Sequence, residues 1–157
     1  MSRNATVLRL FLILNQKYAR SSNYDKGFRS VYKLNAHIVL VTKYRKPAIN
    51  KERLQRLNII FKETFKKWNC VLNDFNAEVD YCHLIIEFKP DVQLSKLIAN
   101  LKTVSSRLIR KEYPELELKY FYGKPYFWTG SYFVASCGGV TVEQLKDYVE
   151  KQSSPKK

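Results

Sequence analysis

NAEVDYCHLIIEF, residues 76–88, is the stretch that decides the fold, because it is typical of a buried β-strand with one polar interruption. Its second half is an apolar, partly β-branched run of strand length. Side chains alternate across a strand, so we predict Tyr81 and His83 on one face and Asp80 and Cys82 on the other. The stretch alone leaves three roles open for the histidine: a metal ligand, a general base or a hydrogen-bonded core residue.

Net charge is the strongest signal in the composition. Lys and Arg number 28 against 14 Asp and Glu, which gives a formal charge of +14 over 157 residues. Such a field suits a polyanion, with nucleic acid first and an anionic membrane surface second, and a generic basic protein is the competing interpretation. The length is that of one domain, and the hydrophobic content of 45% argues against a disordered chain.

Cysteine usage and hydropathy indicate a soluble, cytoplasmic protein. The three cysteines are widely spaced and form no CxxC pair, which argues against a disulfide framework or a structural zinc site and favours a reducing compartment. The apolar run VLRLFLIL, residues 7–14, carries an arginine and is far too short to span a bilayer. We therefore expect no membrane partner.

Composition predicts three segments along the chain. Residues 1–30 form an N-terminal extension and a polar, turn-rich linker, residues 31–152 form the folded domain, and residues 153–157 form a frayed basic tail. The domain opens with a strand over residues 33–41, whose alternation places His37, Val39 and Val41 on one face.

A cluster of cations follows this strand directly. Lys43, Arg45 and Lys46 surround Tyr44, just ahead of Pro47. Cations beside an aromatic ring suit contact with a phosphate and a base, and a solvated strand end is the alternative.

Two amphipathic helices are predicted, over residues 50–68 and 94–111, because apolar residues recur there at spacings of three and four. The polar side of the second helix combines hydroxyl groups with Lys102, Arg107 and Arg110, a combination that binds phosphate well. A solvated helix face explains the same pattern, so both interpretations stay open.

The remaining elements are shorter. Strands are predicted over residues 71–75 and 131–137, and a turn with many aromatic residues over 119–128. A last helix begins at Thr141, where Gln144 completes a capping box, and Tyr148 and Gln152 lie one turn apart on it. The order is strand, helix, strand, strand, helix, strand, helix. It predicts an α+β fold with a ferredoxin-like (RRM-like) antiparallel sheet, helices packed on it, and an extra C-terminal helix that carries Tyr148.

From residue 33 to residue 152 the chain resembles the single-tyrosine HUH transposases of the insertion sequence 200/605 type. The matching stretches occur in family order and at family spacing over roughly three-quarters of the chain, which makes the resemblance more specific than any single motif. They are NAHIVLVTKYRKP, the segment ending DYCHLII, LSKLIANLKTVSSRLIRKEYPEL, FWTGSYFVASCGGV and DYVEKQ.

The resemblance implies a small homodimeric enzyme that cuts and rejoins single-stranded DNA at element ends and recognises subterminal hairpins. Tyr148 would be the nucleophile, leaving a 5′-phosphotyrosine and a free 3′-hydroxyl, and the protein would be nucleoid-associated when bound to DNA. The family's metal ligands correspond here to Tyr81, His83 and Gln152, which would hold Mg²⁺ or Mn²⁺ to polarise the scissile phosphate.

In the family, two histidines that flank one hydrophobic residue bind the metal. Tyr81 departs from this pattern, since it stands where the first of these histidines belongs. A phenol with a pKa of about 10 is protonated at neutral pH and is a poor ligand for Mg²⁺. Three outcomes follow: a weakened enzyme, a copy that binds DNA hairpins without turnover, or a site rescued by another ligand. Alternation directs Asp80 away from His83, and the sequence does not say whether His37 reaches the site. A generic ferredoxin-like RNA binder is a third function that would explain the charge.

Overall fold

The computed structural model describes residues 25–27, 30–32, 34–136 and 142–152, with side chains over 34–136 and 147–152. The predicted basic tail, Thr141 and the side chain of Gln144 lie outside these described parts, so the predicted capping box stays a prediction. The division into an extension, a domain and a tail therefore stays a prediction. The short strands β1 (Asp25–Gly27) and β2 (Ser30–Tyr32) form a hairpin across the predicted linker.

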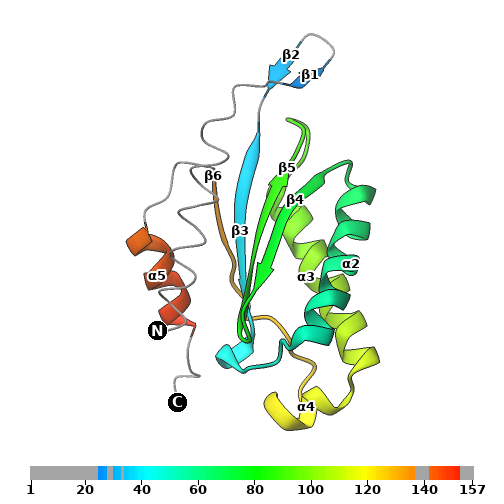
Figure 1. Cartoon of the computed structure of the whole chain (residues 1–157), viewed down its shortest axis with the longest axis vertical. Helices are drawn as coiled ribbons and strands as arrows, with labels where there is room; N and C mark the ends of the chain where they lie inside the picture. The colour runs from blue at the N-terminus through cyan, green and yellow to red at the C-terminus, as the bar shows by residue number, and fades with distance from the viewer. Residues whose placement is uncertain (1–24, 28–29, 33, 137–141, 153–157) are drawn as a thin grey trace.

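A four-stranded antiparallel sheet forms the centre of the domain (Figure 1). Its strands lie in the spatial order β4-β5-β3-β6. Both central strands, β3 and β5, are flanked on both sides, so their register is fixed by two neighbours each. The bounds are β3 (Asn35–Val41), β4 (Val71–Ala77), β5 (Tyr81–Glu87) and β6 (Phe133–Ser136).

The prediction of one strand over residues 76–88 is wrong at its N-terminal end. Asn76 and Ala77 finish β4, and the chain turns through residues 78–80 before β5 begins at Tyr81. The Glu78 amide donates to the Tyr81 carbonyl at 2.9 Å, which closes a tight hairpin. The chain therefore turns where one strand was predicted to continue, and Asp80 of this turn is buried.

Helices α2 (Lys51–Lys67) and α3 (Leu94–Glu112) cover one face of the sheet, as their apolar periodicity predicts. Asn50 caps α2 by accepting a hydrogen bond from the Arg53 amide at 2.8 Å. Between these helices and the sheet lies the main core, in which Phe61, Phe65 and Phe127 are buried to 1% exposure or less. Helix α4 (Glu115–Tyr120), which periodicity did not predict, follows Pro114, a residue that suits a helix start.

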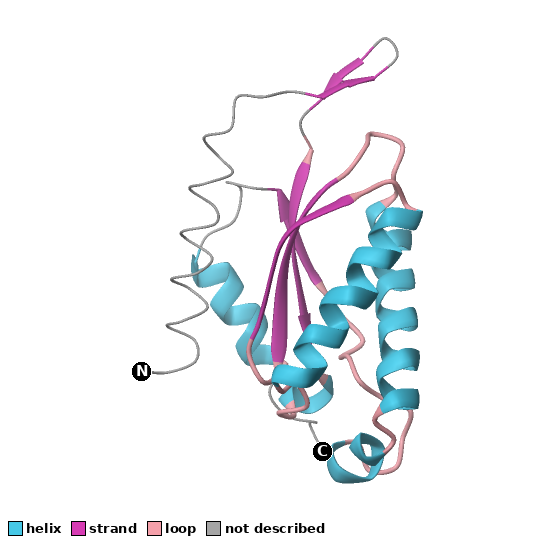
Figure 2. Cartoon of the chain, turned by 45° about the vertical axis from the view of Figure 1, so that its right-hand side comes forward, coloured by secondary structure: helices cyan, strands magenta, loops and turns pink. Residues whose placement is uncertain are grey.

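Helix α5 (Val142–Lys151) lies on the opposite side of the sheet from α2 and α3, as Figures 1 and 2 both show. Between α5 and the sheet lies a smaller apolar cluster, to which the sheet contributes Val39, Val41 and Tyr81 and α5 contributes Val149, with Phe133 and Tyr148 packed against it. Cys82 belongs to the main core and Tyr81 to this second cluster, so the predicted alternation along β5 is confirmed. The α+β class and the helix that carries Tyr148 are confirmed as well.

No helix within the described ranges combines the length and apolar content needed to cross a bilayer.

Candidate functional site

Two imidazoles meet beneath α5, in the middle of the sheet. His37 of β3 and His83 of β5 bring Nδ1 and Nε2 to 3.0 Å, with nearly parallel rings whose centroids are 5.1 Å apart. Burial lowers the pKa of His37 to about 4, and burial with the neighbouring His37 lowers that of His83 to about 3. Both rings are therefore neutral at physiological pH, the state in which imidazole binds metals.

A hydrogen-bonded chain of side chains joins α5 to the segment that precedes β6. Gln152 Oε1 accepts hydrogen bonds from the hydroxyls of Thr129 and Ser131, at 3.0 and 3.2 Å. Ser131 Oγ also lies 3.2 Å from the Tyr148 hydroxyl. Either hydroxyl can be the donor in this contact. Tyr148 and Gln152 are thus held together by the same serine.

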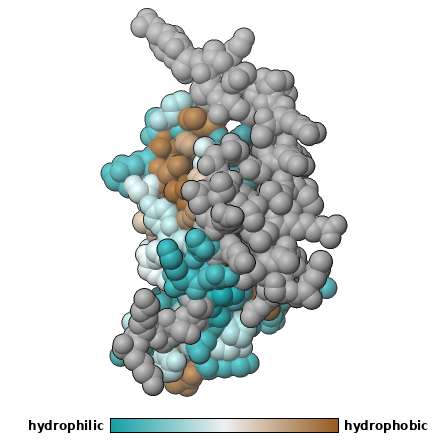
Figure 3. Space-filling view, turned by 90° about the vertical axis from the view of Figure 1, so that its left-hand side faces the viewer, coloured by the Kyte–Doolittle hydropathy of each residue, from teal (hydrophilic) through white to brown (hydrophobic). Residues whose placement is uncertain are grey.

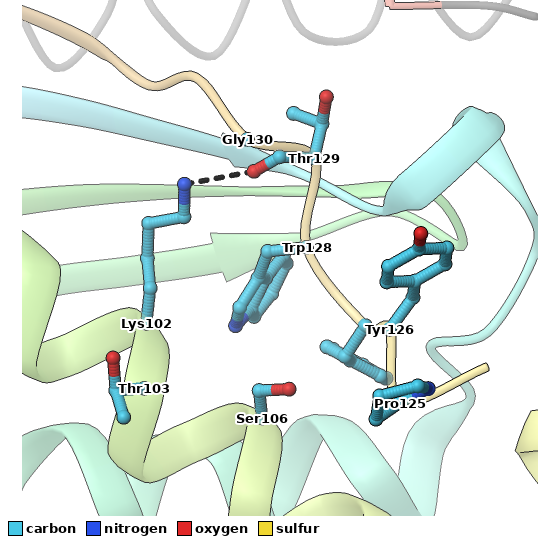
Figure 4. A pocket seen from close by; sticks show the side chains of 9 residues that line it. Lys102, Thr103, Ser106, Pro125, Tyr126, Trp128, Thr129 and Gly130 are labelled. Atoms are coloured by element: carbon cyan, nitrogen blue, oxygen red, sulfur yellow. Dashed lines mark hydrogen bonds between the residues drawn. The ribbon is translucent and has the colours of Figure 1, made fainter. Parts of the chain in front are cut away.

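Lys102 of α3 anchors this segment from the other side of the sheet. Its Nζ donates to the backbone carbonyl of Thr129 at 2.7 Å (Figure 4) and to that of Ser131 at 3.1 Å. Burial and the nearby Lys43 lower the pKa of Lys102, the cost of placing a cation here. Lys102, which was predicted to contact phosphate, thus holds the backbone of Thr129 and Ser131, and Ser131 in turn contacts Tyr148.

The environment of Tyr148 is apolar around the ring and polar at the hydroxyl. Its ring packs on Phe133, with centroids 5.6 Å apart, in the cluster that contains Tyr81. Burial raises the pKa of Tyr148, although the hydrogen bond with Ser131 lowers it in part. The phenol is therefore protonated at neutral pH and must lose its proton in any reaction as a nucleophile.

Strand register orders the predicted metal ligands along this face. Tyr81 lies opposite Val41 and His83 opposite Val39. The Thr129 amide donates to the Val41 carbonyl at 2.8 Å, so the Thr129–Gln152 contact lies at the same end of the sheet as Tyr81. His83 lies two residues further along β5 and faces His37 instead.

Of the three predicted metal ligands, two have donor atoms that suit a divalent ion. His83 offers a neutral imidazole and Gln152 an amide oxygen, whereas the Tyr81 phenol is a weak ligand. Within the described ranges no three side chains of His, Cys, Asp or Glu gather as a metal cluster. The set therefore fits a divalent ion only as a partial site, completed by water or by another ligand.

The predicted cation cluster forms a strained turn in which its members have different tasks. Tyr44 and Arg45 both have positive φ, at 59° and 52°, which costs energy for residues with a Cβ. Arg45 Nε pairs with Asp80 at 3.1 Å, and the Asp80 side chain is 1% exposed. Arg45 thereby ties this turn to the β4–β5 hairpin, and its buried ion pair takes it out of the group free to bind phosphate.

Lys43 and Lys46 of the same turn lie with their ammonium groups over aromatic rings. Lys43 Nζ lies 4.8 Å from the ring centroid of Tyr126, and Lys46 Nζ lies 5.8 Å from that of Tyr122. Tyr44 packs against both tyrosines, so two partly exposed ammonium groups and three rings form one surface. Such a surface suits single-stranded nucleic acid.

The two predicted arginines of α3 also differ. Arg107 is exposed, whereas Arg110 pairs with Glu117 at 3.3 Å and donates to Ser106 at 3.2 Å. Beside them lies a hollow of about 210 Å³, bounded by Lys102, Thr103 and Ser106 of α3 and by residues 125–130 (Figure 4). Its hydroxyls and ammonium group are suitable partners for a phosphate.

The surface near α5 is largely polar. Viewed from the α5 side, much of the described surface is hydrophilic (Figure 3), and Asp147, Glu150 and Lys151 of α5 are exposed.

Sequence reasoning did not assign roles to His37, Thr129 or Ser131. Alternation had placed His37 on the correct face, but its contact with His83 depends on the β3–β5 register. The hydroxyls of Thr129 and Ser131 have no sequence signal of their own, because their partners lie about 20 residues away along the chain.

Comparisons with known proteins agree with each other. The family model described as "Transposase IS200 like" matches residues 30–152. The transposase for insertion sequence element IS200 of Salmonella typhimurium is 27% identical over 116 residues, 74% of each chain. The ISDra2 transposase TnpA of Deinococcus radiodurans is 26% identical over 127 residues, 81% of this chain and 89% of that protein.

Solved structures share the architecture. A crystal structure of a Deinococcus radiodurans R1 protein assigned as a transposase superposes with a TM-score of 0.76 at 27% identity, over 83% of this chain and 99% of that one. A REP-associated tyrosine transposase bound to a REP hairpin has a TM-score of 0.51 at 11% identity, over 80% of this chain and 68% of that one, and supports the fold alone.

Proposed function

This chain belongs to the IS200-like transposase family, and from that membership we propose that it cleaves and rejoins single-stranded DNA at insertion-sequence ends. Tyr148 is the proposed nucleophile. Its phenol oxygen attacks the scissile phosphorus and loses its proton, the bond from phosphorus to the 3′-oxygen breaks, and that oxygen leaves as a 3′-hydroxyl. The 5′-phosphotyrosine conserves the energy of the phosphodiester, so a second 3′-hydroxyl can reverse the step without a nucleotide cofactor.

The observation that carries this proposal is the shared hydrogen bonding of Tyr148 and Gln152. Ser131 binds both side chains at 3.2 Å, and Lys102 holds the Ser131 carbonyl at 3.1 Å. A nucleophile needs this kind of orientation, because a misplacement of about 1 Å can cost roughly 100-fold in rate. A tyrosine on an ordinary solvated helix face would have no reason to be tethered from two sides.

We propose that His83 and Gln152 hold a divalent ion, Mg²⁺ or Mn²⁺, with Tyr81 at the weak third position. A bound ion would polarise the scissile phosphate and offset its developing negative charge. The chain's own contribution is to keep His83 neutral and to hold the Gln152 oxygen at the end of the sheet where Tyr148 lies.

The DNA would be bound by the cationic and aromatic groups next to this site. Among the described residues, four of the predicted contacts form no ion pair with an acidic group and supplement the overall charge of +14: Lys43, Lys46, Lys102 and Arg107. Lys102 and the hollow beside it would receive the strand near Tyr148. Hairpin recognition and a homodimer are further parts of the proposal, and they rest on the family membership.

A second candidate function follows from Tyr81. Loss of a supporting metal contact costs roughly 10–100-fold in affinity, and loss of a direct ligand costs at least as much. In this alternative the chain binds hairpin DNA but does not turn over.

A covalent-adduct assay tests the proposal. The full chain is incubated with labelled single-stranded element ends and Mg²⁺ or Mn²⁺, and adducts are separated on denaturing gels. We expect an adduct with the unchanged chain and none with Tyr148→Phe. Tyr113→Phe is the matched control, because it removes a phenol that donates to Glu52 of α2, a residue with no part in the proposed site.

Each remaining outcome has a defined meaning. If the unchanged chain binds the hairpin without forming an adduct, and Tyr81→His restores adduct formation, the second candidate function is correct. An adduct that survives Tyr148→Phe refutes the nucleophile. Salt-dependent binding that prefers structured RNA to hairpin DNA contradicts both candidates and favours an RNA binder.

A further inference from the structure

His37 and His83 contact each other and take no part in the hydrogen bonds that join Tyr148, Ser131 and Gln152. Building on the proposed function, we infer that His37 is a metal ligand of this chain. His37 and His83 together would bind one divalent transition-metal ion, so that β3 provides the second imidazole in place of the residue at position 81.

The distance between the two nitrogens suits a shared ion. Ligand nitrogens lie about 2.0–2.1 Å from a first-row metal, so two of them at 90–109° about one ion are separated by about 2.9–3.4 Å. His37 Nδ1 and His83 Nε2 are 3.0 Å apart. An N–H···N hydrogen bond has a similar length, but it needs a proton on one of the two nitrogens, whereas both nitrogens must be unprotonated to bind an ion. The two arrangements therefore exclude each other and can be told apart by adding metal.

The scaffold holds both imidazoles on rigid elements. β3 and β5 are the two central strands, and their register pairs His83 with Val39 and His37 with Ile85. The two residues thus occupy adjacent pairs on the face covered by α5. Ligands on paired central strands are more tightly positioned than ligands on loops.

Two imidazoles also change which ion the site prefers. Imidazole ligands suit Co²⁺, Ni²⁺ and Zn²⁺, whereas Mg²⁺ favours oxygen and water. The site would therefore discriminate against Mg²⁺, in contrast to a site built from His83, Gln152 and water alone. His37 and His83 are 0% and 2% exposed, so uptake needs local opening and would be slower than at a surface site.

The composition makes a direct test possible, because the chain contains only two histidines. Every imidazole signal of the tag-free protein belongs to His37 or His83. The full chain, stripped of metal with a chelator, is titrated with Co²⁺ and with Mn²⁺, without DNA and with time to equilibrate. Binding is followed by the visible Co²⁺ spectrum, by Mn²⁺ EPR and by NMR of the two imidazoles.

We expect one Co²⁺ per chain and a shift of both imidazoles on binding. His37→Asn should weaken Co²⁺ binding at least tenfold, as His83→Asn should. Ile85→Val is the matched control, since it removes one methylene beside His37 without removing a donor, and it should leave Co²⁺ affinity unchanged within twofold. Circular dichroism shows whether each variant is folded.

Three results would overturn the inference: no Co²⁺ bound by the unchanged chain, equal affinity in His37→Asn, or a Co²⁺-induced shift of His83 without one of His37. The last result needs no variant, so it decides the question even where His37→Asn does not fold. These measurements contain no DNA, so a negative result would contradict His37 as a metal ligand without contradicting the proposed transposase activity. A negative adduct assay would contradict that activity without contradicting metal binding by His37.

Discussion

The two faces of the sheet use the same strands for different purposes. On the face covered by α2 and α3, the described residues form a continuous apolar core that contains 21 buried side chains. On the face beneath α5 the corresponding cluster has four, and two buried histidines lie among the same strand residues. The first face can be filled by any residues of suitable volume, whereas the second depends on individual polar atoms. Stability and chemistry are thereby separated across one sheet.

The largest effect that tests this separation is a cavity in the main core. Phe61 is fully buried and packs edge-on against Phe75. Phe61→Ala should lower the free energy of unfolding by about 3–5 kcal/mol, whereas Val149→Ala, on the sheet-facing side of α5, should lower it by about 1–2 kcal/mol. Urea denaturation measures both. Equal losses would show that the α5 face carries as much of the stability as the main core.

A pH effect should come from the α5 face alone. Because the folded-state pKa of His37 and His83 lies below the unfolded value of about 6.5, the unfolded chain binds more protons below that pH. The free energy of unfolding should therefore fall by about 1–3 kcal/mol between pH 7.5 and 5.5. Urea melts in chelator at pH 7.5, 6.5 and 5.5 check this. His37→Asn should flatten the curve, and an unchanged slope would contradict the buried neutral pair.

The smallest expected effect concerns one hydroxyl. Ser131→Ala removes the contacts with Tyr148 and Gln152, each worth about 0.5–1.5 kcal/mol. Adduct formation should slow by about three- to tenfold, with little change in stability because Ser131 is exposed. The exposed Ser136 of β6 supplies the control, Ser136→Ala. If both variants formed adduct at the unchanged rate, Ser131 would have no part in positioning Tyr148.

Local pattern was sufficient for most of the fold and insufficient for most of the contacts within the site. Periodicity located α2, α3 and the strand alternation because these depend on neighbours three, four or two residues away. It extended β5 back to residue 76, since a tight turn and a polar strand position look alike in sequence. The family resemblance pointed to Tyr148, His83 and Gln152 as candidates, but it said nothing about how they are held.

The order of elements, the apolar face of each helix and the strong positive charge were determined by the sequence itself, because each depends on residue type and short spacing. Three contacts were decided only by tertiary structure: His37 with His83, Ser131 with Tyr148, and Arg45 with Asp80. Each joins residues 17 to 46 positions apart, so it exists only once strand register and helix docking have set the distance.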